Sequence, residues 1–134
     1  MSSGYTKIAI DDVPNFAAGR MEGIEARPLR DPVGAEQTGA MLHTLAPGVR
    51  QPFGHVHHEV EELCFVLSGS GAVNLGEEIV PLAARDLIRI APSTPRCFEA
   101  GPDGMELLVV GPHRKGDGRL LHGWWGGDVP PEEA

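Results

Sequence analysis

Two histidines and one glutamate in the middle of the chain have the types and spacing of metal ligands. His55 and His57 are two residues apart. On a β-strand, side chains two apart point to the same face, so both imidazoles can reach one point in space. A turn over residues 58–61 would bring the Glu62 carboxylate back to that point. Two imidazoles and one carboxylate suit Fe(II), and Mn(II), Zn(II), Ni(II) or Cu(II) can also occupy such a set. The spacing therefore predicts a site for a divalent transition metal.

Less specific interpretations of the same stretch compete with this one. A His-x-His pair taken alone is often part of a polar surface strand, or a pair of hydrogen-bonded side chains. Glu59 and Glu61 fit a solvated acidic face, although Glu61 and His58 are also candidates to move protons beside a metal.

Three further residues lie on predicted strands before or after the candidate ligands. His43 shares a strand face with Met41, so it either lines the same interior or is a hydrogen-bonded core residue. Cys64 shares the face of Glu62, where it either lines a pocket or is a small buried hydrophobic residue. Cys97 lies between Arg96 and Phe98 and is expected to face away from them.

The elements that must position these side chains are short strands bounded by Gly, Pro, Asn, Asp and Ser. Turns are expected at 31–34, 68–71 and 101–104, and a hairpin turn at 76–77. No 3.6-residue periodicity persists long enough to predict a helix. Regularly spaced short strands are typical of an all-β sandwich or barrel. Strands are expected at residues 6–10, 21–29, 38–46, 62–67, 72–75, 78–81, 86–90, 96–99 and 106–110.

The stretch from Gly48 to Gly69 resembles the first motif of the cupin superfamily, G-x5-H-x-H-x(3,4)-E-x6-G. Six residues separate Gly48 from His55, four separate His57 from Glu62, and six separate Glu62 from Gly69, so only the first gap departs, by one residue. The resemblance covers roughly residues 38–111. It is to the small single-domain members of the superfamily, the cupin type-2 group. It implies a double-stranded β-helix, which is a jelly-roll-like β-barrel, and metal ligation by the two histidines and the glutamate.

The second cupin motif, G-x5-P-x-G-x2-H-x3-N, starts at the expected distance but lacks its named residues. Its positions are occupied by Arg85, Ala91, Ser93, Arg96 and Ala100. Arg96 stands where the family has a fourth ligand histidine. A guanidinium stays protonated and has no lone pair to donate, so Arg96 cannot replace that ligand.

Three roles are open to Arg96 at this stage. It can stand beside a three-ligand metal and clamp a carboxylate or phosphate of the substrate. It can instead pair with Glu62 in a pocket without metal, or point outward with no specific role. A positive charge beside a dication is unfavourable without an anion between them, so a metal here favours an anionic ligand.

Composition and charge limit the partners and the cellular location that we expect for this protein. The 134 residues carry a formal net charge of −8, without any basic run, which disfavours nucleic acids and anionic lipid surfaces as partners. The two cysteines form no disulfide framework, and the N-terminus lacks the apolar core of a signal peptide. With no apolar run long enough for a membrane helix, these features predict a cytoplasmic protein.

These observations predict one domain, with an N-terminal arm of short strands packed on the barrel (1–37), a barrel core (38–111) and a C-terminal tail (112–134). The tail holds Trp124 and Trp125, which are expected to be buried over the barrel mouth or against a second subunit of a homodimer. The expected function is a metal-dependent enzyme, a dioxygenase or an isomerase, acting on a small anionic, oxygen-rich molecule. The alternative is a metal-free, non-catalytic protein that binds a small ligand.

Overall fold

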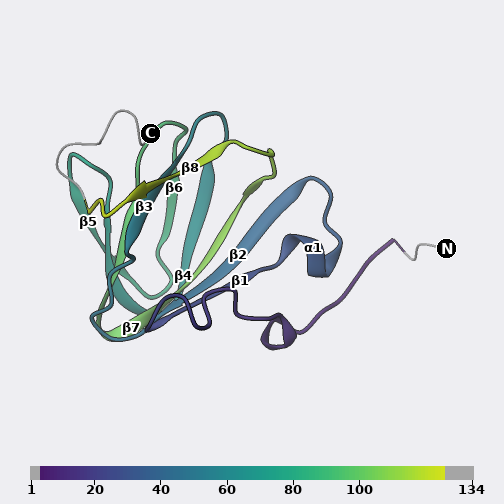
Figure 1. Ribbon diagram of the computed structural model, residues 1–134, viewed down its shortest axis with the longest axis horizontal. Helices are drawn as coiled ribbons and strands as arrows, with labels where there is room; N and C mark the ends of the chain where they lie inside the picture. Colours follow the sequence, from purple (N-terminus) through teal and green to yellow (C-terminus); the bar gives the residue numbers. More distant parts are fainter. Residues whose placement is uncertain (1–3, 126–134) are drawn as a thin grey trace.

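Antiparallel strands build nearly all of the fold in the computed structural model, which describes residues 4–125 (Figure 1). Two single turns of helix accompany the strands within that range: a 3-10 turn at Ile10–Asp12 and the α-helical turn α1 at Arg30–Val33. The prediction of an all-β barrel is confirmed. The strands are β1 Ile24–Pro28, β2 Thr38–Leu45, β3 Phe53–His57, β4 Glu62–Asn74, β5 Ile79–Ala83, β6 Leu87–Ile90, β7 Cys97–Pro112 and β8 Gly118–His122.

The strands form one large and one small sheet. The large sheet has the order β1-β2-β7-β4-β5, and β6 also pairs with β4; the small sheet pairs β3 with β8. Strand β3 is joined to the large sheet through Arg96, the residue just before β7. The amide of His55 donates to the carbonyl of Arg96 at 2.9 Å, and the amide of Arg96 donates back at 3.0 Å. These bonds place the predicted ligands of β3 directly beside Arg96.

Two of the predicted turns are wrong, because the chain continues through them as strand. Residues 68–71 lie inside β4 and residues 101–104 lie inside β7, and the two segments face each other across shifts in register. Gly69 and Gly104 both have positive φ, and a Cβ on Gly69 would lie 2.0 Å from the Gly104 carbonyl oxygen. Glycine-rich β-bulges use the same residues as turns but bend a ladder without ending it.

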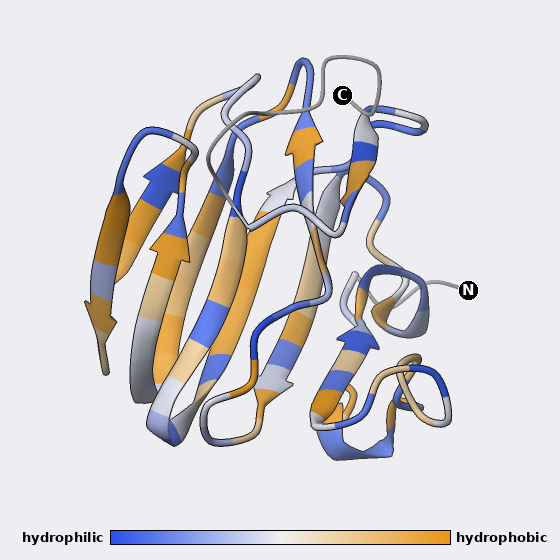
Figure 2. Ribbon diagram, turned by 60° about the vertical axis from the view of Figure 1, so that its left-hand side comes forward, coloured by the Kyte–Doolittle hydropathy of each residue, from blue (hydrophilic) through white to orange (hydrophobic). Residues whose placement is uncertain are grey.

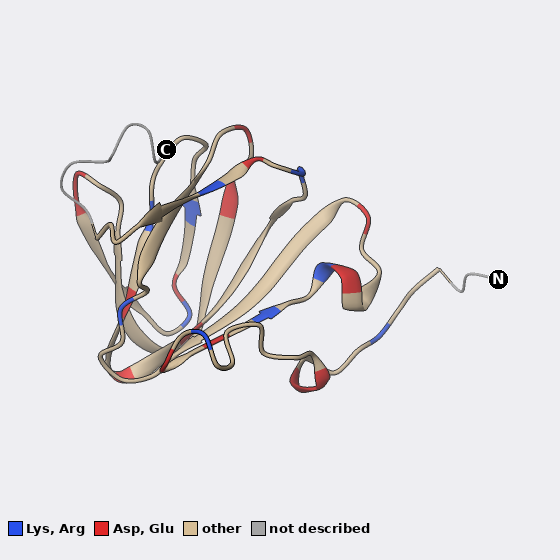
Figure 3. Cartoon of the chain, viewed as in Figure 1, with Lys and Arg blue, Asp and Glu red and all other residues tan. Residues whose placement is uncertain are grey.

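Hydrophobic and more polar residues alternate along several of these strands (Figure 2). On β4, Cys64 and Val66 are buried in the main core, whereas Leu63 and Leu67 are exposed on the opposite face. Figure 3 shows charged residues mainly in turns and near strand ends. The barrel interior is therefore mostly apolar. A charged residue inside it needs a polar partner, because burial without one is unfavourable.

The N-terminal arm covers the outer face of the large sheet. Strand β1 pairs with β2, and Val13, Leu29 and Leu42 form a separate buried cluster against which Ile8 and Ile10 pack. The strand predicted at residues 6–10 is absent from the structure described for that segment. Its isoleucines pack on the face of the sheet, so the segment does not pair with a sheet edge.

The C-terminal segment contributes a strand that the sequence did not reveal. Strand β8, within the predicted tail, pairs with β3 (Figure 1). Beyond it, Trp124 packs with Val56, Leu121 and Cys97 on the face of β3 opposite to the histidines, and Cys97 faces away from Arg96 as expected. Trp124 thus covers an outer wall of the barrel, and residues 126–134 of the predicted tail lie outside the described residues. No helix among the described residues is long and apolar enough to cross a membrane.

Candidate metal centre

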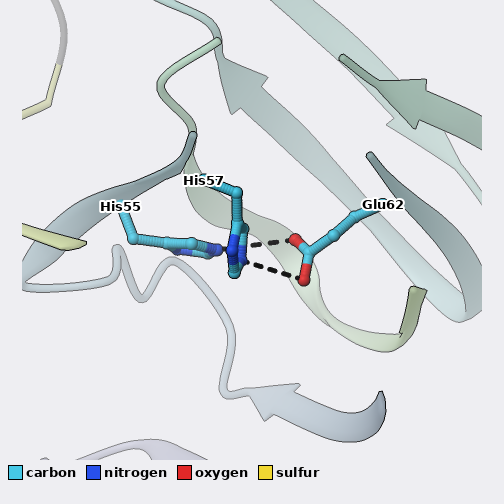
Figure 4. A group of neighbouring side chains, drawn as sticks. All are labelled: His55, His57 and Glu62. Atoms are coloured by element: carbon cyan, nitrogen blue, oxygen red, sulfur yellow. Dashed lines mark ion pairs between the residues drawn. The ribbon is translucent and has the colours of Figure 1, made fainter. Parts of the chain in front are cut away.

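The three predicted ligands converge inside the barrel. His55 and His57 project from β3, and Glu62 projects toward them from the first position of β4 (Figure 4). The His57 Nε2 atom lies 3.2 Å from Glu62 Oε2, and the His55 Nε2 atom lies 3.6 Å from Glu62 Oε1. Candidate ligand atoms of all three residues lie within 4.8 Å of one another. The strand alternation and the 58–61 connection therefore produce the arrangement that the spacing predicts.

Arg96 occupies the wall next to this group and contacts Glu62. Its side chain is fully buried, and its NH1 group donates to Glu62 Oε1 at 2.6 Å. The same guanidinium donates from Nε and NH2 to the carbonyl of Thr94 at 3.2 and 2.9 Å. Of the three roles considered for Arg96, the structure places it in the pairing with Glu62. One carboxylate oxygen is thus held by the protein, while Oε2 faces His57.

The electrostatics of the group favour the protonation states that a metal ligand needs. Burial alone would raise the pKa of Glu62, but hydrogen bonding with His55 and His57 outweighs burial and holds that pKa well below its usual range. Burial lowers the pKa of His55, although Glu62 opposes this shift. An ionised carboxylate and a neutral imidazole are the forms that bind a metal.

A cavity of about 330 Å³ opens onto the group. His57 and Glu62 form part of its wall, together with apolar side chains such as Met41 and Val109. Arg30 and Arg114 also line it, each paired with a neighbouring acid, Arg30 with Asp31 at 3.0 Å and Arg114 with Glu59. Asp31 and Glu62 line the cavity as well, so the charges of the two arginines are matched by carboxylates.

The two predicted proton carriers lie on the surface. Glu61 forms an ion pair with Arg89 at 2.5 Å, and both side chains are more than half exposed. His58 is exposed, and its amide donates to the carbonyl of Asp117. A role for Glu61 or His58 in proton transfer stays a prediction.

His43 faces the barrel interior from β2, as one of its two sequence-based interpretations expected. Its Nδ1 atom is buried without a hydrogen-bond partner. Burial lowers the pKa of His43 to about 4, with His55 adding to the decrease and Glu62 opposing it. For Cys64, burial raises the thiol pKa to about 12, which agrees with a small buried hydrophobic residue.

Asp117 is the residue of this site that the sequence analysis missed. It comes from the turn before β8, and its side chain is only 3% exposed. Its Oδ2 atom lies 3.4 Å from His57 Nδ1, on the side of the ring away from Glu62. An isolated aspartate in a Gly-Asp-Gly turn gives no signal in the sequence, because such residues are ordinary turn formers.

Comparison with known proteins identifies the fold family. A family model described as a cupin domain matches residues 41–111, more than half of the chain. The chain belongs to the cupin family. Among solved structures, a sugar phosphate isomerase of the cupin superfamily from Silicibacter pomeroyi is similar, with a TM-score of 0.71 and 21% identity over 87% of this chain and 80% of that one.

Two other solved structures are similar to this cupin over nearly its whole length. A cupin protein from Bacteroides fragilis has a TM-score of 0.67 and 25% identity, covering 97% of this chain and 99% of that one. The polyketide cyclase RemF from Streptomyces resistomycificus has a TM-score of 0.71 and 23% identity over 94% and 89% of the two chains. No curated protein matches the sequence.

The residues of this cupin fit a divalent metal with three protein ligands. Two partly buried imidazoles and an ionised carboxylate are a sufficient donor set for Fe(II) and related ions. Each imidazole directs Nε2 toward the carboxylate, and the Nδ1 side of His57 faces a second carboxylate, that of Asp117. The difference from a four-ligand site is Arg96, which holds one oxygen of Glu62.

Proposed function

We propose that this cupin holds a divalent transition metal, Fe, Mn, Zn, Ni or Cu, at His55, His57 and Glu62. With it, the protein acts on a small anionic, oxygen-rich molecule by isomerase-type or dioxygenase-type chemistry. The convergence of the three side chains, two of which line the cavity, is the observation that carries this proposal. A bound metal would act there as a Lewis acid or as a site for O₂.

Side chains around the metal would have two roles, to orient its carboxylate ligand and to exclude water. Arg96 keeps Glu62 oriented, because it binds Oε1 and leaves Oε2 toward His57. Apolar side chains of the cavity, such as Met41 and Val109, would exclude water from the reacting part of the substrate.

The arginines of the cavity would recognise the anionic part of the substrate. Exposed ion pairs such as Arg114–Glu59 contribute little free energy, so an incoming carboxylate or phosphate can take the place of the acid. The similar isomerase from Silicibacter pomeroyi, described as acting on sugar phosphates, supports an oxygen-rich anion as the substrate class.

The test compares metal content in the wild type, His57→Ala and His58→Ala after purification without added metal. We expect about one equivalent of a transition metal in the wild type and in His58→Ala, and less than about a tenth in His57→Ala. His58 is a matched control, because it is the adjacent histidine and its side chain is exposed. Wild type that neither carries metal nor rebinds it after dialysis against Mn(II) or Zn(II) would refute the proposal.

A second candidate function is a metal-free pocket that binds a small ligand. The observation that favours it is the buried Arg96–Glu62 pair, which neutralises the carboxylate without any ion. The same measurement separates the candidates, because this one requires that none of the three proteins bind metal.

We also propose that the protein forms a homodimer through the outer face of β4 and β6. Leu63, Leu67 and Leu87 are exposed there, at 42, 38 and 62%. Contiguous exposed apolar side chains of this kind are typical of protein interfaces. Multi-angle light scattering of the wild type and of Leu87→Glu would test this, since the variant should be monomeric.

A further inference from the structure

Asp117 holds His57 from the side opposite Glu62. Its Oδ2 atom lies 3.4 Å from His57 Nδ1, an ion-pair distance, and this buried nitrogen makes no hydrogen bond of good geometry with any residue described. The imidazole ring is therefore flanked by two carboxylates, with Glu62 Oε2 at 3.2 Å from Nε2.

The same carboxylate also ties down the connection between the two ligand strands. Asp117 Oδ1 accepts from the amide of Glu59 at 2.9 Å, and Oδ2 accepts from the amide of Val60 at 3.3 Å. The backbone carbonyl of Asp117 accepts from the amide of His58 at 3.3 Å. These bonds span the 58–61 segment, which sets the distance between His57 and Glu62.

The neighbouring residue places the ring from the same corner. Gly118 pairs with His57 in the β3–β8 ladder, and a Cβ at Gly118 would lie 3.0 Å from His57 Cε1. A side chain at residue 118 would therefore press on the imidazole, which would have to shift by a few tenths of an ångström. Both residues lie outside the stretch that the cupin family model matches, residues 41–111.

We propose that Asp117 is a positioning residue of the metal site, which directs Nε2 of His57 to the metal and fixes its distance from Glu62. This inference rests on the proposed function, since it assumes that His57 binds a metal. A carboxylate on the far nitrogen of a ligand histidine fixes which nitrogen carries the proton, and it holds the ring in place. Its loss typically weakens metal binding by about 10–100-fold.

The first measurement is Zn(II) affinity, by competition with a chelator, for the wild type, Asp117→Asn and Asp86→Asn. We expect Asp117→Asn to bind about 10–100-fold more weakly. Asp86 is the control, because its carboxylate also accepts a backbone amide, that of Ala83 at 2.8 Å, but it lies in the β5–β6 turn on the surface. Asp86→Asn should bind as the wild type does, and equal affinity in all three proteins would overturn the inference.

The second measurement reports on the His57 ring without any metal. The ¹⁵N chemical shifts of its nitrogens, at one fixed pH, should show Nδ1 protonated in the wild type and unprotonated in Asp117→Asn. A purely structural role of Asp117 in the 58–61 segment would leave these shifts unchanged, and that outcome would overturn the inference. If the wild type binds no Zn(II), the proposed function fails, while the chemical shifts still test the link between Asp117 and His57.

Gly118→Ala provides a second variant in case Asp117→Asn does not fold. It keeps the carboxylate but places a methyl group against the His57 ring. We expect weaker Zn(II) binding from the displaced imidazole, and unchanged affinity would contradict the idea that this corner positions His57.

Discussion

The two walls of the candidate metal centre differ in what they present to it. The β3–β4 wall presents three groups that can donate electron pairs, His55, His57 and Glu62, with Asp117 supporting one of them. The wall at the start of β7 presents Arg96, a buried cation that can donate only hydrogen bonds. One wall carries the three residues of the candidate metal site, whereas the other carries a cation that binds the carboxylate.

The difference shows that a buried arginine can hold the carboxylate of a candidate metal ligand. It neutralises Glu62 and fixes one of its oxygens, as a ligand histidine does not. The cost is the desolvation of a guanidinium, which the bonds to Glu62 and to the Thr94 carbonyl offset. Burial lowers the pKa of Arg96, and Glu62 opposes that shift, so the pair depends on both partners.

The largest effect should follow from removing this cation. Arg96→Met should destabilise the metal-free protein by about 3–5 kcal/mol, because it leaves Glu62 buried without its charged partner. Urea unfolding measures the change. Arg89→Met is the matched control: its ion pair with Glu61 is mostly exposed, so the loss should be at most about 1 kcal/mol. Similar decreases in the free energy of unfolding in the two variants would contradict the comparison of the two walls. The double variant Arg96→Met/Glu62→Met should recover most of the free energy of unfolding that Arg96→Met loses.

A pH dependence should arise from His43, which faces the same interior from a third side. Its folded pKa of about 4 lies below the ordinary value of 6.5, so protons bind the unfolded chain first as the pH falls. The free energy of unfolding of the metal-free protein should therefore fall between pH 6.5 and 4, by up to about 3 kcal/mol from this residue.

Urea unfolding at pH 7 and at pH 4.5 measures this contribution, with His43→Gln and the exposed His122→Gln as the compared variants. The decrease should shrink in His43→Gln and persist in His122→Gln. Because burial also lowers the pKa of His55, part of the decrease should remain in His43→Gln. An unchanged decrease in that variant would show that His43 is accessible to protons in the folded state.

The smallest of the three effects should follow from giving the Arg96 wall a group that can bind a metal. Arg96→His should raise Zn(II) affinity by about tenfold or more, equivalent to about 1.4 kcal/mol, because it adds an imidazole and releases Glu62 Oε1. Arg96→Gln releases the same oxygen without supplying a ligand, so it separates the two causes. Competition with a chelator measures both variants, and a weaker site in Arg96→His would show that the arginine is needed to orient Glu62.

The candidate ligands could be predicted because their signal is local. His55 and His57 share a strand face by alternation alone, and Glu62 follows after a short connection, so no distant contact is needed to bring them together. The same reasoning placed β2 at residues 38–46, one residue longer than observed. Local propensity failed at residues 68–71 and 101–104, where glycines suited to a turn instead form a bulged pair between β4 and β7.

The sequence by itself determined an all-β chain with a two-histidine, one-carboxylate group, because strand alternation and turn chemistry act over a few residues. Only the tertiary structure decided which long-range partners meet that group. Arg96 reaches Glu62 from 34 positions away, and Asp117 reaches His57 from the turn before β8. Such contacts depend on how strands far apart in the chain pair, and no local sequence pattern encodes that pairing or the burial of the contacts.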